Sequence, residues 1–259
     1  MNVLEIEQLR KNLPQLKLDI ATMEVAEGEF AVLLGAAKSG KASLFKLILD
    51  MLFPDFGVIR VFGLDSHKDS VEIKQQLGMI ARRPGLLYHA SLRQLKNMVR
   101  PFYRAWQEEV YRNCLQLFDI NENQIYGRVG NAQKKQFVLA LALAHRPRLL
   151  LLDEPFMNMP NKAKERIAQV LWREQRERGL SLLLATSSPE EAARLADTLH
   201  IVHLGSLLLT LPLAHLSDYC GDLEWQALNK RSQDEKTAEK IAQTQALFDY
   251  YTKTGEGKA

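Results

Sequence analysis

The feature that most constrains this 259-residue sequence is a short glycine-containing loop. It reads Gly35-Ala36-Ala37-Lys38-Ser39-Gly40-Lys41-Ala42-Ser43. An apolar run at 30–34 precedes it and a helical pattern at 44–49 follows, an order typical of a phosphate-binding P-loop. In such a loop, backbone N–H groups and the helix N-terminus surround a phosphate, and Lys41 adds a full positive charge. One position departs: the pattern has Ser or Thr after this lysine to hold Mg²⁺, and this chain has Ala42.

The composition excludes several classes of protein. The formal net charge of +3 is too small to predict a nucleic-acid partner, and no basic block is interleaved with aromatic residues. Cys114 and Cys220 lie far apart without metal-ligand spacing, which favours a reducing cytosol and packing roles. No apolar run approaches 18 residues, so we expect no membrane-spanning segment. A cytoplasmic protein of this kind would reach a membrane by docking to another chain.

A second stretch supplies carboxylates that suit the P-loop. The run 149–152 consists of four leucines, and its brevity between Pro147 and Pro155 favours a strand buried on both faces. Asp153 and Glu154 close it. A carboxylate at the end of a strand next to the P-loop strand holds Mg²⁺ through water, and a second polarises the attacking water. We therefore predict Asp153 as a metal residue and Glu154 as a catalytic residue.

Strands and helices alternate along the chain, which predicts an α/β fold with a parallel core. A helical pattern covers about 91–119 with an interruption at Pro101. A polar stretch at 121–136 precedes a compact apolar helix at 137–145. After residue 217 the chain is charged and short of core residues, so we expect a solvated helical tail over 217–259.

With these motifs in place, residues 2–216 resemble the ATP-binding subunits of ABC transporters, nearest the bacterial type with a separate permease. The motifs follow the family's order: the phosphate loop at 35–43, a Gln-loop region at 80–84, a signature region at 129–133, Walker B at 149–154 and a switch region at 185–188. The resemblance implies a P-loop NTPase core with a mostly parallel sheet, an antiparallel β subdomain and a helical subdomain at about 86–147. It also implies an ABC-type nucleotide-binding domain at 1–216.

The departures from the family pattern fall mainly on groups that contact Mg²⁺, phosphate or the base. They are Lys38 for a loop glycine, Ala42 for the Mg²⁺ serine, Arg82 for the Gln-loop glutamine, Gly130 for the signature serine, Pro160 for the D-loop aspartate, Ser187 for the switch histidine and, loosely aligned, Leu13 for the aromatic that stacks on adenine. The matching residues are Gly35, Gly40, Lys41, Ser43, Asp153 and Glu154. The predicted nucleotide-binding residues are those of the loop at 35–43 together with Arg82.

Arg82 and Lys38 are new cations at a site that has lost Mg²⁺ ligands. One hypothesis is that Arg82 pairs with the Walker B carboxylates, or with a phosphate, and replaces the charge of the metal. The alternative is that Arg82 and Arg83 form an exposed pair that touches the permease.

The sequence is compatible with three functions. The first is a degenerate ATP-binding subunit of an ABC transporter that docks a membrane permease from the cytosol, near 82–91, with weak or absent hydrolysis. The resemblance implies ATP and Mg²⁺ as cofactors, and a second ABC subunit as homodimer or heterodimer partner. The second is an active ATPase that powers export, with Ser43 or water in place of the Mg²⁺ serine and Glu154 as the base. The third is a regulatory or scaffold protein with this fold.

Overall fold

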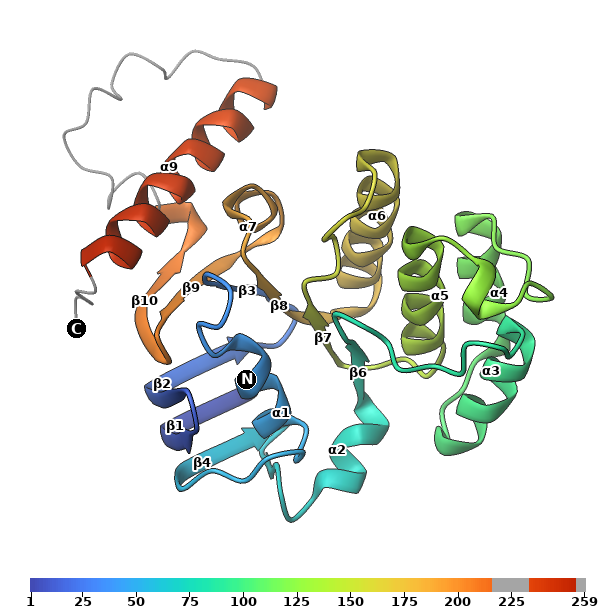
Figure 1. The fold of residues 1–259 in the computed structure, drawn as a ribbon, viewed down its shortest axis with the longest axis horizontal. Helices are drawn as coiled ribbons and strands as arrows, with labels where there is room; N and C mark the ends of the chain where they lie inside the picture. The colour runs from blue at the N-terminus through green and yellow to red at the C-terminus, as the bar shows by residue number, and fades with distance from the viewer. Residues whose placement is uncertain (216–232, 255–259) are drawn as a thin grey trace.

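The computed structural model describes residues 1–215 and 233–254, and one ten-stranded sheet runs through this part of the chain (Figure 1). The strand order is β5-β4-β1-β2-β10-β9-β3-β8-β7-β6. The strands are β1 (Asn2–Leu13), β2 (Leu16–Ala26), β3 (Phe30–Leu34), β4 (Phe56–Val61), β5 (Leu64–Asp65), β6 (Leu77–Ile80), β7 (Leu149–Asp153), β8 (Ser181–Thr186), β9 (Thr198–His203) and β10 (Ser206–Pro212).

Some of the helices cover the sheet, and others form a separate group beside it (Figure 1). They are α1 (Lys41–Ile48), α2 (Ser70–Gln76), α3 (Leu92–Val99), α4 (Glu108–Phe118), α5 (Asn131–Ala144), α6 (Asn161–Arg178), α7 (Pro189–Leu195) and α9 (Gln233–Thr254), with short 3₁₀ turns at Arg100–Phe102, Tyr126–Arg128 and Leu213–His215. No helix in the described ranges combines the length and apolar character needed to cross a bilayer.

The pairing of the strands confirms the predicted α/β fold. Strand β3 pairs in parallel with β8 and β9, and β7 pairs in parallel with β8 and β6. The N-terminal strands β1, β2 and β4 pair antiparallel, as expected for the β subdomain. One expectation is wrong: β7 is not next to the P-loop strand β3, because β8 lies between them. Hydrophobic pattern identifies a buried strand but does not specify its neighbours.

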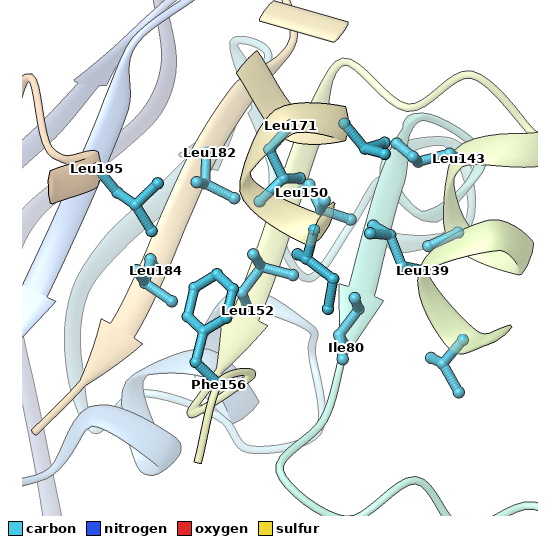
Figure 2. Close-up of a cluster of buried hydrophobic side chains, with 14 of the residues drawn as sticks. Ile80, Leu139, Leu143, Leu150, Leu152, Phe156, Leu171, Leu182, Leu184 and Leu195 are labelled. Carbon is cyan, nitrogen blue, oxygen red and sulfur yellow. The ribbon is translucent and has the colours of Figure 1, made fainter. Parts of the chain in front are cut away.

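Alternating side chains of the central strands build a core on each face of the sheet. Figure 2 shows one of these faces, where Leu150 and Leu152 of β7 and Leu182 and Leu184 of β8 lie among side chains of the covering helices. The next residues along β7, such as Leu151, belong to the opposite core with α1 and the antiparallel strands. Burial on both faces explains why β7 reads as a continuous leucine run.

The helices α3, α4 and α5 form the predicted helical subdomain (Figure 1). The expected interruption at Pro101 is a 3₁₀ turn. Helix α5 begins at Asn131 and not at Phe137. The prediction missed this first part because its polar side chains were read as a loop, whereas Lys135 and Gln136 are buried.

The predicted C-terminal helix is present as α9, but it is not wholly solvated. It packs against α7 and β9, with Leu247 and Tyr251 buried. Apolar side chains spaced four residues apart give α9 a face that fits the body of the protein. Cys220 and Trp225 of the predicted tail lie outside the described residues. The domain boundary at 216 stays a prediction.

A groove of about 530 Å³ lies between the sheet and the helical subdomain. Its lining includes Met79 of β6, Leu86 in the loop that follows, Leu141 of α5, and Tyr103 and His145. The ring of His145 stacks on Tyr103 with 3.9 Å between centroids. Burial lowers the pKa of His145 to about 4 and outweighs nearby backbone groups that raise it.

We expect the His145→Phe variant to lose part of the acid sensitivity of the fold. The His145 pKa is about 6.5 in the unfolded chain and is depressed in the folded protein. Its stabilising effect is therefore complete above pH ~6.5 and is lost as the pH falls toward ~4, a loss of up to about 3 kcal/mol. Urea unfolding of parent and variant at neutral and acid pH measures it. Burial also lowers the pKa of His200 to about 4. Because both proteins contain His200, its contribution to the pH dependence cancels when they are compared. Equal pH dependence in the two proteins would contradict the prediction.

Candidate phosphate-binding site

The loop at 35–43 opens onto a cavity of about 490 Å³ at the carboxyl ends of the parallel strands. Most of the predicted site residues line it together. The lining consists of residues 37–43, the turn Leu13-Pro14-Gln15-Leu16, Arg82, Asp153 and Glu154. The loosely aligned Leu13 therefore lies at the cavity, where an aliphatic side chain offers contact area but no aromatic face.

The loop holds Lys41 in a buried position at the start of α1. Its Nζ donates hydrogen bonds to the backbone carbonyls of Gly35 and Ala36, the latter at 2.9 Å, and lies 3.5 Å from Ser39 Oγ. Burial lowers the pKa of Lys41, and the charges of Glu154 and Asp153 oppose this effect. The loop therefore places a lysine ammonium where the P-loop pattern requires one.

Backbone conformation explains why two loop positions favour glycine. Gly40 has φ +111°, and a Cβ there would lie 2.6 Å from Leu18 Cδ2. Lys38, where the family pattern has glycine, also adopts a left-handed φ of 66°. A side chain in this region costs roughly 1 kcal/mol or more. The chain thus keeps the glycine loop conformation and carries an exposed lysine on it.

The two Walker B carboxylates, Asp153 and Glu154, line the same cavity as the loop, although β8 lies between the two strands that carry them. The N–H of Glu154 donates to Ala185 O at 2.9 Å, and the N–H of Gly35 donates to the neighbouring Thr186 O at 3.1 Å. Glu154 Oε1 lies 3.8 Å from Lys41 Nζ, and both side chains are buried. Burial and the charge of Glu154 raise the pKa of Asp153, whereas Lys41 and Arg82 lower it. The intervening strand therefore bridges the two motifs and does not separate them.

Arg82 lies at the cavity but does not form the predicted ion pair. Its Nη2 donates to Met157 Sδ at 3.4 Å. In the described parts of the chain, no carboxylate lies within ion-pair distance of its guanidinium, and Lys41 is the partner of Glu154. Arg82 acts on Asp153 through its charge and a backbone hydrogen bond, both of which lower the Asp153 pKa.

Lys135 is a residue of this site that the sequence reasoning missed. Its buried Nζ donates to the carbonyls of Glu154 and Met157, each at 3.0 Å. Burial lowers the pKa of Lys135, and Glu191 and Glu154 are the main charges that raise it. The available signal was helical spacing, since Lys135 precedes the buried Leu139 by one helical turn. Through these two hydrogen bonds, Lys135 links α5 to the segment that follows β7.

Other predicted motif positions lie outside the cavity lining. Gly130 precedes α5, and a Cβ built there would meet no atom within 4 Å. Ser187 is exposed after β8, and its neighbour Thr186 donates to Glu191 Oε2 at 2.6 Å. Pro160 precedes α6 and is also exposed. The resemblance implies that the signature acts in the site of a partner chain.

The cavity suits a phosphate chain better than it suits Mg²⁺. The glycine loop, the helix N-terminus and Lys41 offer donors and positive charge to an anion. Mg²⁺ takes oxygen ligands in near-octahedral geometry. At the two positions where the resemblance implies Mg²⁺ ligands, this chain has the methyl group of Ala42 and the guanidinium of Arg82, neither of which has an acceptor. Residues 1–215 and 233–254 hold no group of three or more His, Cys, Asp or Glu side chains that could bind a metal.

Comparison with known proteins identifies the family that this chain resembles. The sequence profile of the family described as ABC transporter matches residues 18–157. The ABC transporter ATP-binding protein YtrB of Bacillus subtilis is 26% identical over 218 residues, which are 83% of this chain and 74% of YtrB.

Solved structures show the same fold. The ATP-binding subunit of an ABC transporter superposes with a TM-score of 0.76 at 22% identity, covering 93% of this chain and 99% of that one. A dimeric post-hydrolysis state of the ATP-binding cassette MJ0796, bound to ADP and Pi, has a TM-score of 0.71 at 17% identity, over 81% and 98%. At these identities the structural likeness establishes the fold alone.

We expect the Lys135→Met variant to be less stable than the parent. Methionine keeps the apolar stem but removes the donor from the carbonyls of Glu154 and Met157, a loss of about 1–3 kcal/mol. Urea unfolding measures the change. The control is Lys134→Met, because the Lys134 ammonium lies over the rings of Tyr88 and Tyr126 at 5.3 Å, a contact worth less, about 0.5–1 kcal/mol. Equal losses in both variants would refute a specific role for Lys135.

Proposed function

Since this chain belongs to the ABC transporter family, we propose that it is a degenerate ATP-binding subunit whose own site binds nucleotide and hydrolyses it slowly or not at all. The observation that carries this proposal is the cavity itself. It keeps the phosphate loop, Lys41 and both carboxylates, but it presents a methyl group and a guanidinium where Mg²⁺ ligands are expected.

Under this proposal, some residues of the site would bind the nucleotide, whereas others would no longer support its hydrolysis. The loop amides and Lys41 would hold the phosphates, and Leu13 and its neighbours would contact the base. Glu154, the predicted base, is buried and lies beside Lys41. Loss of one preorganised contact costs about 10²–10³-fold in rate, and several losses in one site act together without multiplying.

We further propose that a second ABC subunit completes the assembly. The cassette MJ0796 forms a dimer, and the resemblance implies that each site combines one chain's P-loop with the other chain's signature. This chain offers Gly130 where that signature has serine. It therefore supplies a weakened surface to the partner's site as well as a weakened site of its own.

The groove between the sheet and the helical subdomain is the proposed permease contact. It is lined largely by apolar residues and lies next to the Gln-loop segment. Leu87 and Tyr88, in the predicted docking segment at 82–91, are 56% and 60% exposed, and Met51, which lines the groove, is 65% exposed. Apolar side chains gathered at a groove are typical of a surface that another protein covers. We propose that a membrane permease docks here from the cytosol.

We expect purified chain to turn over ATP at least about 10²-fold more slowly than an intact cassette of the family. The Glu154→Gln variant should show the same residual rate as the parent, because Ala42 and Arg82 supply no Mg²⁺ ligand and Glu154 is held beside Lys41. Phosphate release from ATP, with and without the partner subunit, measures the rate. The control is Glu190→Gln, since Glu190 is exposed and pairs with Arg194. A measurable rate that only Glu154→Gln abolishes would favour the active ATPase instead.

We expect Tyr88→Glu to weaken the association with the permease by about tenfold or more, because it places a charge in an apolar contact. Sedimentation of the purified chain with membranes that contain its permease measures the association. Leu204→Glu is the control, since Leu204 is 69% exposed and lies between β9 and β10, away from the groove. No dependence of sedimentation on the permease would favour the scaffold function.

A further inference from the structure

The cavity carries its own positive charge at the place where a metal would supply it. Three cations, Lys38, Lys41 and Arg82, line it together with two carboxylates, Asp153 and Glu154. The carboxylates alone would repel a phosphate chain, and in an ordinary site Mg²⁺ screens that repulsion. Here the excess of cations provides the screening without a metal.

The charge of Glu154 is already balanced. Glu154 Oε1 and Lys41 Nζ are 3.8 Å apart, with side chains that are 9% and 6% exposed. An ion pair at this depth is screened little by water. Lys135 adds a second buried ammonium, which donates to the Glu154 carbonyl at 3.0 Å. Glu154 therefore has no need of a metal as counter-charge.

Arg82 lines the cavity together with the other carboxylate, Asp153, and in the described part of the chain its guanidinium makes one hydrogen bond. Burial and the charge of Glu154 raise the pKa of Asp153, and the guanidinium charge and a backbone hydrogen bond of Arg82 oppose this rise. The guanidinium's hydrogen bond is to the Met157 thioether, 3.4 Å away. Sulfur is a weak acceptor, so an anionic oxygen would displace it at small cost. Guanidinium groups bind phosphate oxygens by paired, charge-assisted hydrogen bonds.

The same residues act against a metal ion. Ala42 removes a hydroxyl ligand, and Arg82 replaces an amide oxygen with a fixed positive charge. Mg²⁺ bound between the phosphates and Asp153 would lie close to that charge. Because like charges repel, the substitution at 82 lowers the affinity for a metal–nucleotide complex while it raises the affinity for the bare anion.

We propose that this cavity binds the triphosphate of a nucleotide as a metal-free anion, with Arg82 as the residue that determines this preference. The inference rests on the proposed function in one respect, namely that the site binds nucleotide. It adds the ionic form of the ligand and the residue that selects it.

Equilibrium binding of radiolabelled ATP to the full chain, in EDTA and in excess Mg²⁺, tests the preference. We expect the affinity in EDTA to equal or exceed that in Mg²⁺, and Arg82→Gln to lower the affinity in EDTA by about tenfold, as for a lost charge-assisted hydrogen bond. Arg83→Gln is the matched control, because Arg83 is exposed and lies outside the cavity lining. It should change the affinity by less than about twofold.

The reciprocal variant restores the missing ligands. Ala42→Ser combined with Arg82→Gln should make binding improve with Mg²⁺, by about tenfold. Ala42 and Arg82 are both exposed, so the variant is expected to fold, and urea unfolding checks this. A double variant that folds and stays indifferent to Mg²⁺ would overturn the role of residues 42 and 82.

The remaining outcomes separate this inference from the proposed function. Binding by the parent that improves tenfold or more with Mg²⁺ would overturn the inference and leave nucleotide binding intact. Absence of binding in both conditions would overturn both. Equal effects of Arg82→Gln and Arg83→Gln would also overturn the inference, and would support a permease contact for the arginine pair.

Discussion

A buried lysine holds the two halves of this site together. Lys41 bonds to carbonyls of its own loop and lies 3.8 Å from Glu154, at the end of another strand. The two strands, β3 and β7, are not neighbours, and β8 spans the gap through hydrogen bonds to Gly35 and Glu154. Parallel pairing makes this possible because it brings the carboxyl ends of all three strands to one edge. Without that edge, loop and carboxylates would not form one cavity.

Cations from different parts of the fold lie around the same two carboxylates of the cavity. Lys135 reaches the Glu154 carbonyl from α5, and Arg82 lies beside Asp153 from the segment after β6. The helical subdomain and the sheet thus both contribute cations to the same pair of acids. If the proposed motif alignment holds, Ala42 and Arg82 have a common consequence: the cavity offers fewer oxygen ligands to a metal and more protein cations near the carboxylates. A single substitution would not have this effect.

Much of the fold and part of the site followed from residue patterns. The leucine run at 149–152 predicted a doubly buried strand because burial on both faces removes polar alternation, and β7 is that strand. The spacing of loop glycines and lysine predicted a loop between a strand and a helix, and β3, this loop and α1 follow one another in that order, because such a loop depends on local backbone geometry. Helical spacing before Leu139 was the local signal for Lys135, but it stands in a polar stretch predicted as a loop, and its carbonyl partners are distant in sequence. The start of α5 was misplaced for the same reason.

The sequence by itself determined the phosphate loop, the buried strands and the residue types at the motif positions, because these depend on residue type and short-range spacing. Only the tertiary structure decided which charges meet. It paired Glu154 with Lys41, turned the Arg82 side chain toward Met157, and set β8 between the two motifs. The physical reason is that Coulomb energy and hydrogen bonding depend on distance in space. Strand order and side-chain direction fix that distance, and neither is written in local periodicity.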